Sequence, residues 1–599
     1  MESEKVSDLN RAFAGLWLDH DLEEANDRLR IAFNEIVGKE KKITPSVADE
    51  KAKWQMRTWI RIYYLFSDKS AWFPGRLQSD IQEKIEFLFW NYGLAKSSIE
   101  RADPKYVWFI QGSENHDMMD LGNAFLALQA LEDLPKYAGR DLTDGHSIEE
   151  HLAAWNSYFK LYCTERCKHG LFIEVGSPTY GKYLIPEIVN LFDFAEDSEL
   201  RSKAKTLLDL TWANWSMEQL GGVRGGGKAR CYQGNYSRNG RSDSWFQMGH
   251  ILLGSQWALD GSRYTHPIQG FGFVLATTGY FLPELVKDLA LSPEDRGEYA
   301  VVSQSPGKMK SLDKIPPYGG HSCWYSMDSK DPRLVRYTWC TPNHIMGSFW
   351  VDPSLAVEFN IHPDQPERAD NSYAAISAQN RWQGIVFATD PDARIFPQCV
   401  GKPDKNHPGL STTYDQQIAV QHENVMLIRK NPAMKNLTGL RVYLSPGMKE
   451  RIVEEGGWWL IEEGDSYAAF RAFSATGEID SVSMAWDDDS FLRVSEPDAP
   501  IVFVTGRKKN FPEVDDFLDW VNSHESIRED DQLDYRFTDS SGSDRTLTIW
   551  LRDQKLPAID GKPIELSPTV VYQSPFLKSR SDEDGAVLRF KGQEILFDF

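Results

Sequence analysis

The sequence predicts an α+β protein in two parts, with a helical part first and an antiparallel β part second. Up to about residue 295, apolar residues recur mostly at helical spacing. After about residue 300, the pattern changes to short apolar runs separated by turn residues, which is typical of strands. At 599 residues the chain is too long for one hydrophobic core, so we expect two domains, residues 1–295 and residues 296–599.

The helices of the first part are predicted from their apolar faces. Residues 52–66 are apolar on more than one face, as expected for an inner helix of a layered array. Several of the connections are long and contain Gly and Pro, and long loops in compact domains tend to carry function. The predicted helices are 21–37, 51–66, 78–94, 115–131, 147–167, 181–195, 198–219, 243–258 and 270–291.

The strands of the second part are predicted from short apolar runs between turn residues. Their number and length indicate stacked antiparallel sheets, that is, a multi-sheet β-sandwich. The predicted strands are 334–340, 355–361, 383–388, 424–430, 439–444, 457–462, 466–473, 500–505 and 546–551.

The net charge of −22 argues against nucleic acid as the main partner. An anionic substrate would therefore need a local basic patch on this acidic chain. No apolar run is long enough to span a membrane. The first residues, Met-Glu-Ser-Glu-Lys, are not a signal peptide, so we expect a cytoplasmic protein if the chain is complete, and a secreted or periplasmic one if a leader has been removed.

The six cysteines have no framework spacing, so no disulfide scaffold is predicted. Cys163, Cys167 and His169 are close in sequence, but they lack a fourth metal ligand. Two thiols on one helix facing the core are the simpler interpretation. We therefore predict no metal site here and no required cofactor.

Residues 111–117, Gln-Gly-Ser-Glu-Asn-His-Asp, place an amide and an imidazole where a helix is predicted to begin. Ser113 is a suitable N-cap, and the free N–H groups of a first helical turn attract anions. Asn115 and His116 would strengthen that attraction for a carboxylate. Taken alone, the heptapeptide is more often a capped surface helix with an incidental His. Trp108, Gln111 and Glu114 are the neighbouring candidates for substrate binding.

A second loop, residues 174–183, contains Gly and Pro and sets two tyrosines at or just before a helix. Tyr180 or Tyr183 could donate or accept a proton if its surroundings shift its pKa from about 10. Both tyrosines could equally serve as wedges between helices.

A third loop, residues 221–241, is rich in Gly and in cations and has no acidic residue. Its cations, Arg224, Lys228, Arg230, Arg238 and Arg241, make it the expected basic patch. Arg224, Lys228, Arg230 and Tyr232 are its candidates for substrate binding. Residues 222–229 also match the beginning of a phosphate-binding P-loop, but Ala229 stands where Ser or Thr should bind magnesium, and a helix rather than a strand precedes the loop. Nucleotide binding is therefore disfavoured.

Together, these features resemble polysaccharide lyases of the heparinase II/III-like and alginate (oligoalginate) lyase type. The resemblance implies an incomplete (α/α) toroid of about five to six helical hairpins joined to the β part, and cleavage of uronic-acid glycans by β-elimination. It implies that Asn115 and His116 neutralise the carboxylate and that Tyr180 is the catalytic tyrosine, with Tyr183 in reserve. Tyr318 and His321, in the loop 316–325, are the candidates from the second domain. Some members carry a structural zinc in the β part, for which this sequence shows no convincing ligand set.

The residue types suit this chemistry. Removal of the C5 proton of a uronate requires stabilisation of the charge that develops on its carboxylate, and a Tyr or His can transfer the protons. The predicted partner is thus an anionic polysaccharide or oligosaccharide, with no metal needed, and no oligomeric state is predicted. One alternative is a glycoside hydrolase that uses Glu114 or Asp117 with Glu174. Another is a non-catalytic carbohydrate-binding protein.

Overall fold

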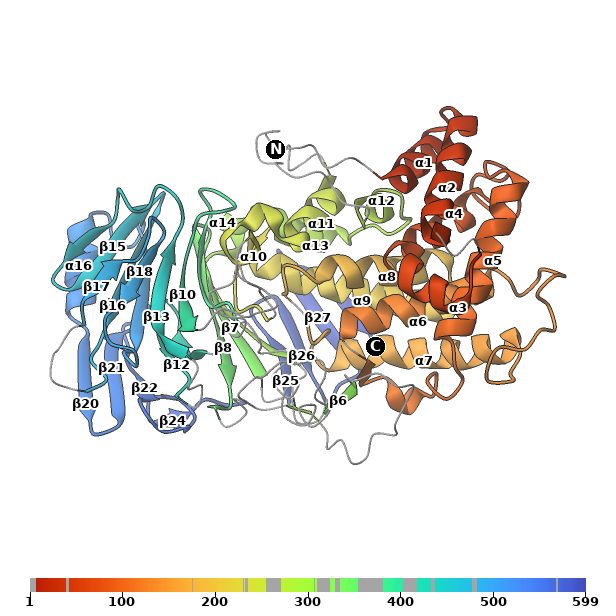
Figure 1. The fold of residues 1–599 in the computed structure, drawn as a ribbon. Coiled ribbons are helices and arrows are strands. Elements are labelled where there is room, and N and C mark those ends of the chain that lie inside the picture. The colour runs from red at the N-terminus through yellow and green to blue at the C-terminus, as the bar shows by residue number, and fades with distance from the viewer. Residues whose placement is uncertain are drawn as a thin grey trace.

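The structure is a computed structural model of the chain. It describes residues 7–38, 42–111, 113–174, 176–229, 231, 235–254, 271–305, 308–309, 324–328, 334–353, 381–401, 417–432, 437–476, 482–566 and 569–599. Helices form the first half and several antiparallel sheets form the second, which confirms the predicted α+β class (Figure 1).

Most of the predicted helices of the first half are present. The described helices there are α1 Asp8–Leu18, α2 Leu22–Val37, α3 Pro45–Val47, α4 Met56–Phe66, α5 Ser79–Lys96, α6 Glu114–Gln129, α7 Ile148–Lys168, α8 Gly181–Phe194, α9 Ser198–Met217, α10 Asn235–Arg238, α11 Ser244–Leu253, α12 Phe271–Ala276, α13 Glu284–Leu291 and α14 Pro293–Arg296. Helices α2, α5, α6, α7, α8 and α9 begin and end within two residues of the predicted bounds.

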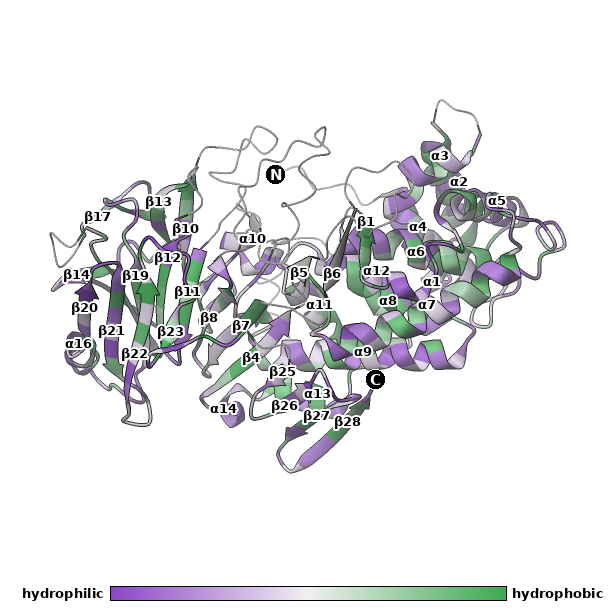
Figure 2. Ribbon diagram, turned by 90° about the horizontal axis from the view of Figure 1, so that it is seen from below, coloured by the Kyte–Doolittle hydropathy of each residue, from purple (hydrophilic) through white to green (hydrophobic). Residues whose placement is uncertain are grey.

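Inner and outer helices alternate along the chain. Helices α4, α6 and α8 are buried over nearly their whole length, whereas α5, α7 and α9 keep an exposed polar face. Figure 2 shows the resulting bands of hydrophobic and hydrophilic residues along α7 and α9. This alternation of inner and outer helices is the arrangement expected of an incomplete (α/α) toroid.

Three helical predictions need correction. The predicted helix 270–291 is two helices, α12 and α13, because the chain leaves the helix after Ala276 and Pro283 then precedes the next one. The segment 51–66 does not begin as a regular helix: a π-helical turn, η2 (Ala48–Ala52), and a 3₁₀ turn, η3 (Lys53–Gln55), come before α4. Helix α1 was not predicted, although its buried apolar residues have helical spacing.

Within the described residues, one 12-stranded antiparallel sheet dominates the second half. In spatial order its strands are β17 Met484–Trp486, β18 Phe491–Val494, β13 Leu437–Leu444, β10 Arg394–Gly401, β9 Gly384–Phe387, β8 His344–Val351, β7 Leu334–Cys340, β4 Tyr299–Ser305, β25 Val570–Gln573, β26 Leu577–Arg580, β27 Gly585–Phe590 and β28 Gln593–Asp598.

Smaller sheets pack beside the large one. A six-stranded sheet has the order β11 Gln417–His422, β12 Val425–Lys430, β19 Ile501–Arg507, β16 Ser466–Ala472, β15 Trp458–Glu463 and β14 Val453–Glu455. A five-stranded sheet contains β20 Glu525–Glu529, β21 Gln532–Thr538, β22 Asp544–Trp550, β23 Ala558–Ile559 and β24 Lys562–Pro563. A three-stranded sheet has the order β1 Phe109–Gln111, β6 Trp324–Asp328 and β5 Lys308–Met309. A two-stranded sheet pairs β2 Gln219–Leu220 with β3 Val223–Arg224.

Two apolar layers hold the sheets together as a sandwich. One fills the space between the 12-stranded and six-stranded sheets, with Leu440 and Phe470 from opposite sides. The other joins the six-stranded sheet to the five-stranded sheet and to helix α16 (Val514–Asn522), with Val504 and Leu547. Helix α16 was not predicted, and the predicted strand 355–361 lies outside the described residues.

The two halves share one hydrophobic core. Side chains of the C-terminal strands, among them Val571, Leu577 and Leu588, belong to the same buried cluster as the helical residues. In Figure 1, β25, β26 and β27 lie beside the helices rather than with the outer sheets. The C-terminal strands therefore form one edge of the 12-stranded sheet and also support the helical array.

None of the described helices is both long and apolar enough to cross a lipid bilayer. The cysteines of the described chain, Cys163, Cys167, Cys231, Cys340 and Cys399, are all buried. Cys163 and Cys167 lie in the helical core, as predicted.

Candidate active site

Helix α6 begins as predicted, but its N-cap works differently. Ser113 occupies the cap position with extended backbone angles, yet its hydroxyl does not bond a backbone N–H of the first turn. It donates instead to Oδ1 of Asn115, over 2.6 Å. This bond fixes the orientation of the Asn115 amide.

Asn115 is fully buried, and its Nδ2 has no hydrogen-bond partner among the described residues. A buried amide N–H without a partner costs about 1–3 kcal/mol, so such a group is uncommon in a folded protein. It lies in the first turn of α6, where backbone N–H groups also point outward. The helix start thus has spare hydrogen-bond donors.

The imidazole of His116 begins a row of four aromatic rings, which we call the aromatic row. The ring of Trp54 contacts His116 edge-on with 5.2 Å between centroids, and it contacts Tyr183 at 5.4 Å. Tyr183 in turn lies 6.5 Å from Tyr180. The structure therefore brings together His116, from the start of α6, and both tyrosines of the 174–183 loop.

Trp54 is the part of this row that the sequence did not indicate. It lies in the 3₁₀ turn η3, directly after the π-helical turn η2, and its side chain is 49% exposed. Irregular helical turns of this kind are frequent at functional sites. Because of these irregular turns, Trp54 is exposed, whereas nearly all residues of the following helix α4 are buried.

Two cations flank Tyr183. The guanidinium of Arg57 lies 5.4 Å from the centre of its ring, and the ammonium of Lys182 lies 5.2 Å from it. Burial raises the pKa of the Tyr183 hydroxyl above its ordinary value, and the positive charge of Arg57 opposes that rise. The hydroxyl therefore keeps its proton at neutral pH.

A pocket of about 300 Å³ adjoins the aromatic row. The residues that line it include Asn10, Trp54, Gln55, Arg57, Lys182 and Tyr183. Its walls thus combine an exposed indole, a phenol and two cations. This combination suits an anionic ligand that also has an apolar face.

The predicted substrate-binding residues Glu114 and Trp108 lie beneath this surface. Glu114 is buried and pairs with Arg166 over 2.9 Å, and the Arg166 guanidinium lies 3.7 Å from the centre of the Trp108 ring. Burial raises the pKa of Glu114 to about 7, although Arg166 opposes the change. These side chains support the start of α6 rather than line the pocket.

The carboxylates considered for a hydrolase are all buried. Asp117 pairs with Arg101 over 2.6 Å, and burial raises its pKa to about 6. Glu174 is buried next to Glu114 and donates its backbone N–H to that carboxylate over 3.3 Å. This bond joins the 174–183 loop to α6.

The 174–183 loop is also held by the start of α11. The Trp245 indole donates to the carbonyl of Ser177 over 3.0 Å, and the Ser244 N–H donates to the carbonyl of Pro178 over 2.9 Å. A Cβ at Gly181 would approach the Trp245 ring to 2.8 Å. Glycine at this position therefore lets the helix of Tyr183 approach the indole.

The glycine-rich loop differs from the predicted surface patch. Arg224 is fully buried, and its Nη2 bonds Asn214 over 2.6 Å and Glu218 over 2.7 Å. A Cβ at Gly225 would lie 2.3 Å from Ile345, and one at Gly227 would lie 2.8 Å from the Ser348 carbonyl. The glycines thus allow close packing of the loop against β8, and they do not form a phosphate cradle.

Lys228 also lies inside the molecule. Its backbone exchanges two hydrogen bonds with Trp382, and its ammonium lies 3.9 Å from the centre of that ring. Burial lowers its pKa to about 8. Lys228 therefore joins the helical half to the β half. A Cβ added at Gly176, which has a positive φ, would lie 3.5 Å from the Arg224 Nε, so glycine at this position lets the second loop pack closely against Arg224.

Arg230, Tyr232, Tyr318 and His321 lie outside the described residues, and Gln111 is described only by its backbone. That backbone pairs with Trp324 of β6, so a strand of the second half adjoins the loop that leads into α6. The three short strands β1, β6 and β5 lie next to one another in Figure 2.

One group in the described chain has metal-ligand character. Ligand atoms of His422, Glu423 and Asp539 lie within 4.8 Å of one another. However, Asp539 already accepts from Arg545 over 2.7 Å and from the N–H of Ser543, and these bonds hold its pKa well below the ordinary value. With three ligands and a neighbouring cation, the group does not fit a tetrahedral zinc site.

Neither a comparison with protein-family models nor one with curated proteins gives a match for this chain. The functional argument therefore depends on the site itself.

Proposed function

We propose that the protein is a polysaccharide lyase that cleaves a uronic-acid-containing glycan by β-elimination at the aromatic row. The observation that carries the proposal is the contact of one exposed indole, Trp54, with both His116 and Tyr183, beside a pocket that contains Arg57. An imidazole, a protonated phenol and cations are the groups that this elimination requires.

The first requirement is to stabilise negative charge on the uronate. Loss of the C5 proton moves charge onto the neighbouring carboxylate, so donors aimed at that carboxylate lower the barrier. The buried Nδ2 of Asn115, the imidazole of His116 and the start of α6 would supply them. The buried pair of Glu114 and Arg166 would hold this helix start in place.

The second requirement is proton transfer. A base removes the C5 proton, the electron pair forms the C4–C5 double bond, the C4–O4 bond breaks, and an acid protonates O4. Tyr183 is the donor to O4, because its hydroxyl keeps its proton at neutral pH. Within the described residues, Tyr180, whose ring lies 6.5 Å from that of Tyr183, is the group that would accept the C5 proton.

Substrate binding would use the remaining pocket groups. The half-exposed ring of Trp54 offers a flat apolar surface to one face of a sugar ring. Arg57 and Lys182 would attract uronate charges to an otherwise acidic protein, although Arg57 also pairs with the buried Glu187 at 3.3 Å. This local positive character replaces the surface patch that the glycine-rich loop was expected to form.

The test is incubation of the protein with a panel of uronic-acid glycans, following the ultraviolet absorbance of the unsaturated product. A lyase gives this absorbance together with new reducing ends, and the Tyr183→Phe variant gives neither. New reducing ends without the absorbance would overturn the proposal in favour of hydrolysis. Binding of the glycans without any new ends would instead favour a carbohydrate-binding protein.

A further inference from the structure

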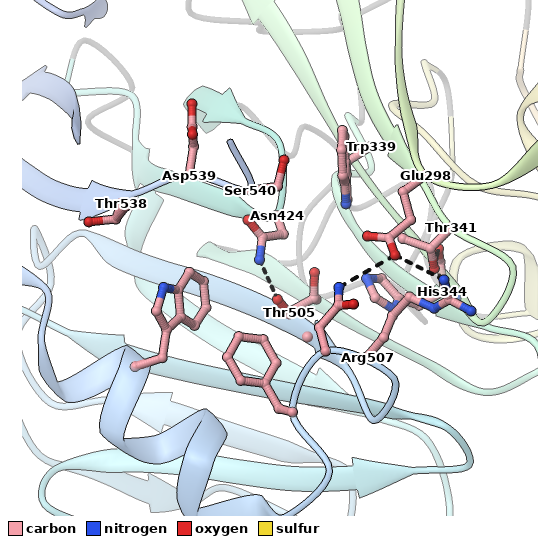
Figure 3. A pocket seen from close by; sticks show the side chains of 14 residues that line it. Glu298, Trp339, Thr341, His344, Asn424, Thr505, Arg507, Thr538, Asp539 and Ser540 are labelled. Atoms are coloured by element: carbon pink, nitrogen blue, oxygen red, sulfur yellow. Dashed lines mark hydrogen bonds and ion pairs between the residues drawn. The ribbon is translucent and has the colours of Figure 1, made fainter. Parts of the chain in front are cut away.

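A second pocket lies in the β half, on elements that do not take part in the aromatic row. It has a volume of about 270 Å³ and is formed by β7, β8, β19, α16 and the end of β21 (Figure 3). Small-molecule sites commonly have volumes of about 300–1,000 Å³. This pocket lies just below that range, which suits one small molecule.

Three polar atoms of its lining residues have no hydrogen-bond partner within the described part of the chain. They are Nε2 of His344, Oδ1 of Asn424 and Oγ1 of Thr505. His344 and Thr505 are almost completely buried, at 1% and 0% exposure. Because a buried polar atom without a partner is costly, three of them around one pocket point to a hydrogen-bonding occupant.

The orientation of these groups is fixed by their neighbours. Asn424 donates its amide to the Thr505 carbonyl over 2.6 Å, so its free oxygen is an acceptor. His344 bonds Ser466 through Nδ1 over 2.9 Å, which leaves Nε2 for an occupant. An acceptor, an imidazole nitrogen and a hydroxyl together match partners that both donate and accept, as hydroxyl groups do.

The charges around the pocket are balanced. Arg507 pairs with Glu298 over 2.9 Å, and Asp539 pairs with Arg545 over 2.7 Å. Burial holds the pKa of His344 at about 3, so its imidazole is neutral. An anionic or cationic occupant would therefore find no unpaired counter-charge among these groups, whereas an uncharged one needs none.

Aromatic side chains line the same space. Trp339 comes from β7, while Phe511 and Trp520 lie together with 5.2 Å between ring centroids. Aromatic rings offer apolar faces to the C–H surface of a sugar ring. The pocket thus combines flat apolar surfaces with hydrogen-bonding groups for hydroxyls.

We propose that this pocket binds a single neutral sugar unit. The inference does not depend on the proposed lyase activity, because the two sites share no residue. The two sites also differ in charge: cations flank the aromatic row, whereas the charged groups around this pocket are paired.

The experiment is titration of the full-length protein with neutral methyl glycosides of hexoses, pentoses and 6-deoxyhexoses, measured by calorimetry and saturation-transfer NMR. At least one glycoside should bind saturably. Thr505→Val, which removes only the hydroxyl, and Asn424→Leu should each weaken binding at least about tenfold. Thr438→Val, an exposed position on β13, and Trp54→Ala, in the other pocket, should leave it unchanged.

Two results would overturn the inference. One is the absence of saturable binding by every glycoside of the panel, which would leave water as the partner of the three polar atoms. The other is binding that Trp54→Ala abolishes and Thr505→Val preserves, which would place the sugar at the aromatic row. Circular dichroism checks that each variant folds. If Thr505→Val is unstable, Asn424→Leu tests the same pocket independently.

Discussion

The indole of Trp54 meets the imidazole of His116 edge-on, with their planes at 80° and their centroids 5.2 Å apart. Since Trp54 is half exposed, its removal should affect the site more than the fold. We expect Trp54→Ala to lower kcat/KM by about tenfold to a hundredfold, equivalent to about 1–3 kcal/mol, through lost contact with the substrate. Trp72→Ala is the matched control, because Trp72 is 48% exposed and lies outside the aromatic row. Equal losses in both variants would contradict the assignment.

Tyr183→Phe tests proton donation directly. The substitution removes one hydroxyl and keeps the ring between Trp54 and Arg57. We expect kcat to fall by about 10²–10⁴-fold with little change in KM, because general acid catalysis contributes about this much. Tyr137→Phe is the control, since that buried hydroxyl has no partner among the described residues and its loss should leave kcat unaltered. A Tyr183→Phe enzyme with full turnover would move the donor elsewhere.

The pair of Glu218 with Arg224 is expected to be important for stability. Glu218 also lies 3.4 Å from Arg336 and accepts from Thr338 over 3.0 Å, and all of these groups are buried. Glu218→Gln leaves two buried guanidinium groups without a counter-charge, which we expect to lower the free energy of unfolding by about 3–5 kcal/mol. Denaturant titration measures the loss. Glu594→Gln, which breaks an exposed pair with Arg589, should change stability by less than about 1 kcal/mol.

Glu114 should make stability depend on pH. Burial raises its folded-state pKa to about 7, above the value near 4.5 expected for the unfolded chain. Between these two pH values the folded protein binds more protons than the unfolded chain. The contribution of Glu114 to the free energy of unfolding is therefore fully present below about pH 4.5 and is lost as the pH rises through about 7. The Glu114→Gln variant should therefore show a less negative slope of unfolding free energy between about pH 5 and pH 7, by on the order of 1 kcal/mol per pH unit.

The control for this titration is Glu24→Gln, an exposed residue that pairs with Arg28. Its slope should match that of the unmodified protein. A parallel slope in Glu114→Gln would show that this carboxyl titrates at an ordinary pKa.

The spacing of apolar residues predicted most of the helices of the first half, because the buried positions of an amphipathic helix are apolar and recur every three to four residues. The start of α6 at Glu114 lies one residue from the predicted start, and α7 and α9 match within two residues at each end. The prediction of one helix over 270–291 did not account for the break between α12 and α13, although Thr277, Thr278, Gly279 and Pro283 are residues that commonly interrupt a helix. The apolar residues on both sides of the break gave the whole segment a helical appearance.

The candidate site was predicted in part. Asn115, His116 and the tyrosines could be recognised because their residue types and turn chemistry are local properties. Trp54 could not, since its exposure depends on the π-helical and 3₁₀ turns before α4, which spacing does not encode. The burial of Arg224 was equally hidden, because Glu218 lies just before the loop and Thr338 comes from a strand more than one hundred residues later.

The last strands have a consequence for how the chain is made. Strand β25 pairs with β4, through Tyr572 opposite Ser303, and Ser574 bonds Met217 at the end of α9. During synthesis, the whole helical array therefore leaves the ribosome before β25 and the following strands, which cover part of it. Until residues 570–598 have been synthesised, β4 keeps an unpaired edge and the helical core keeps an exposed apolar flank, so a chain truncated before residue 570 would expose surface that favours aggregation and proteolysis.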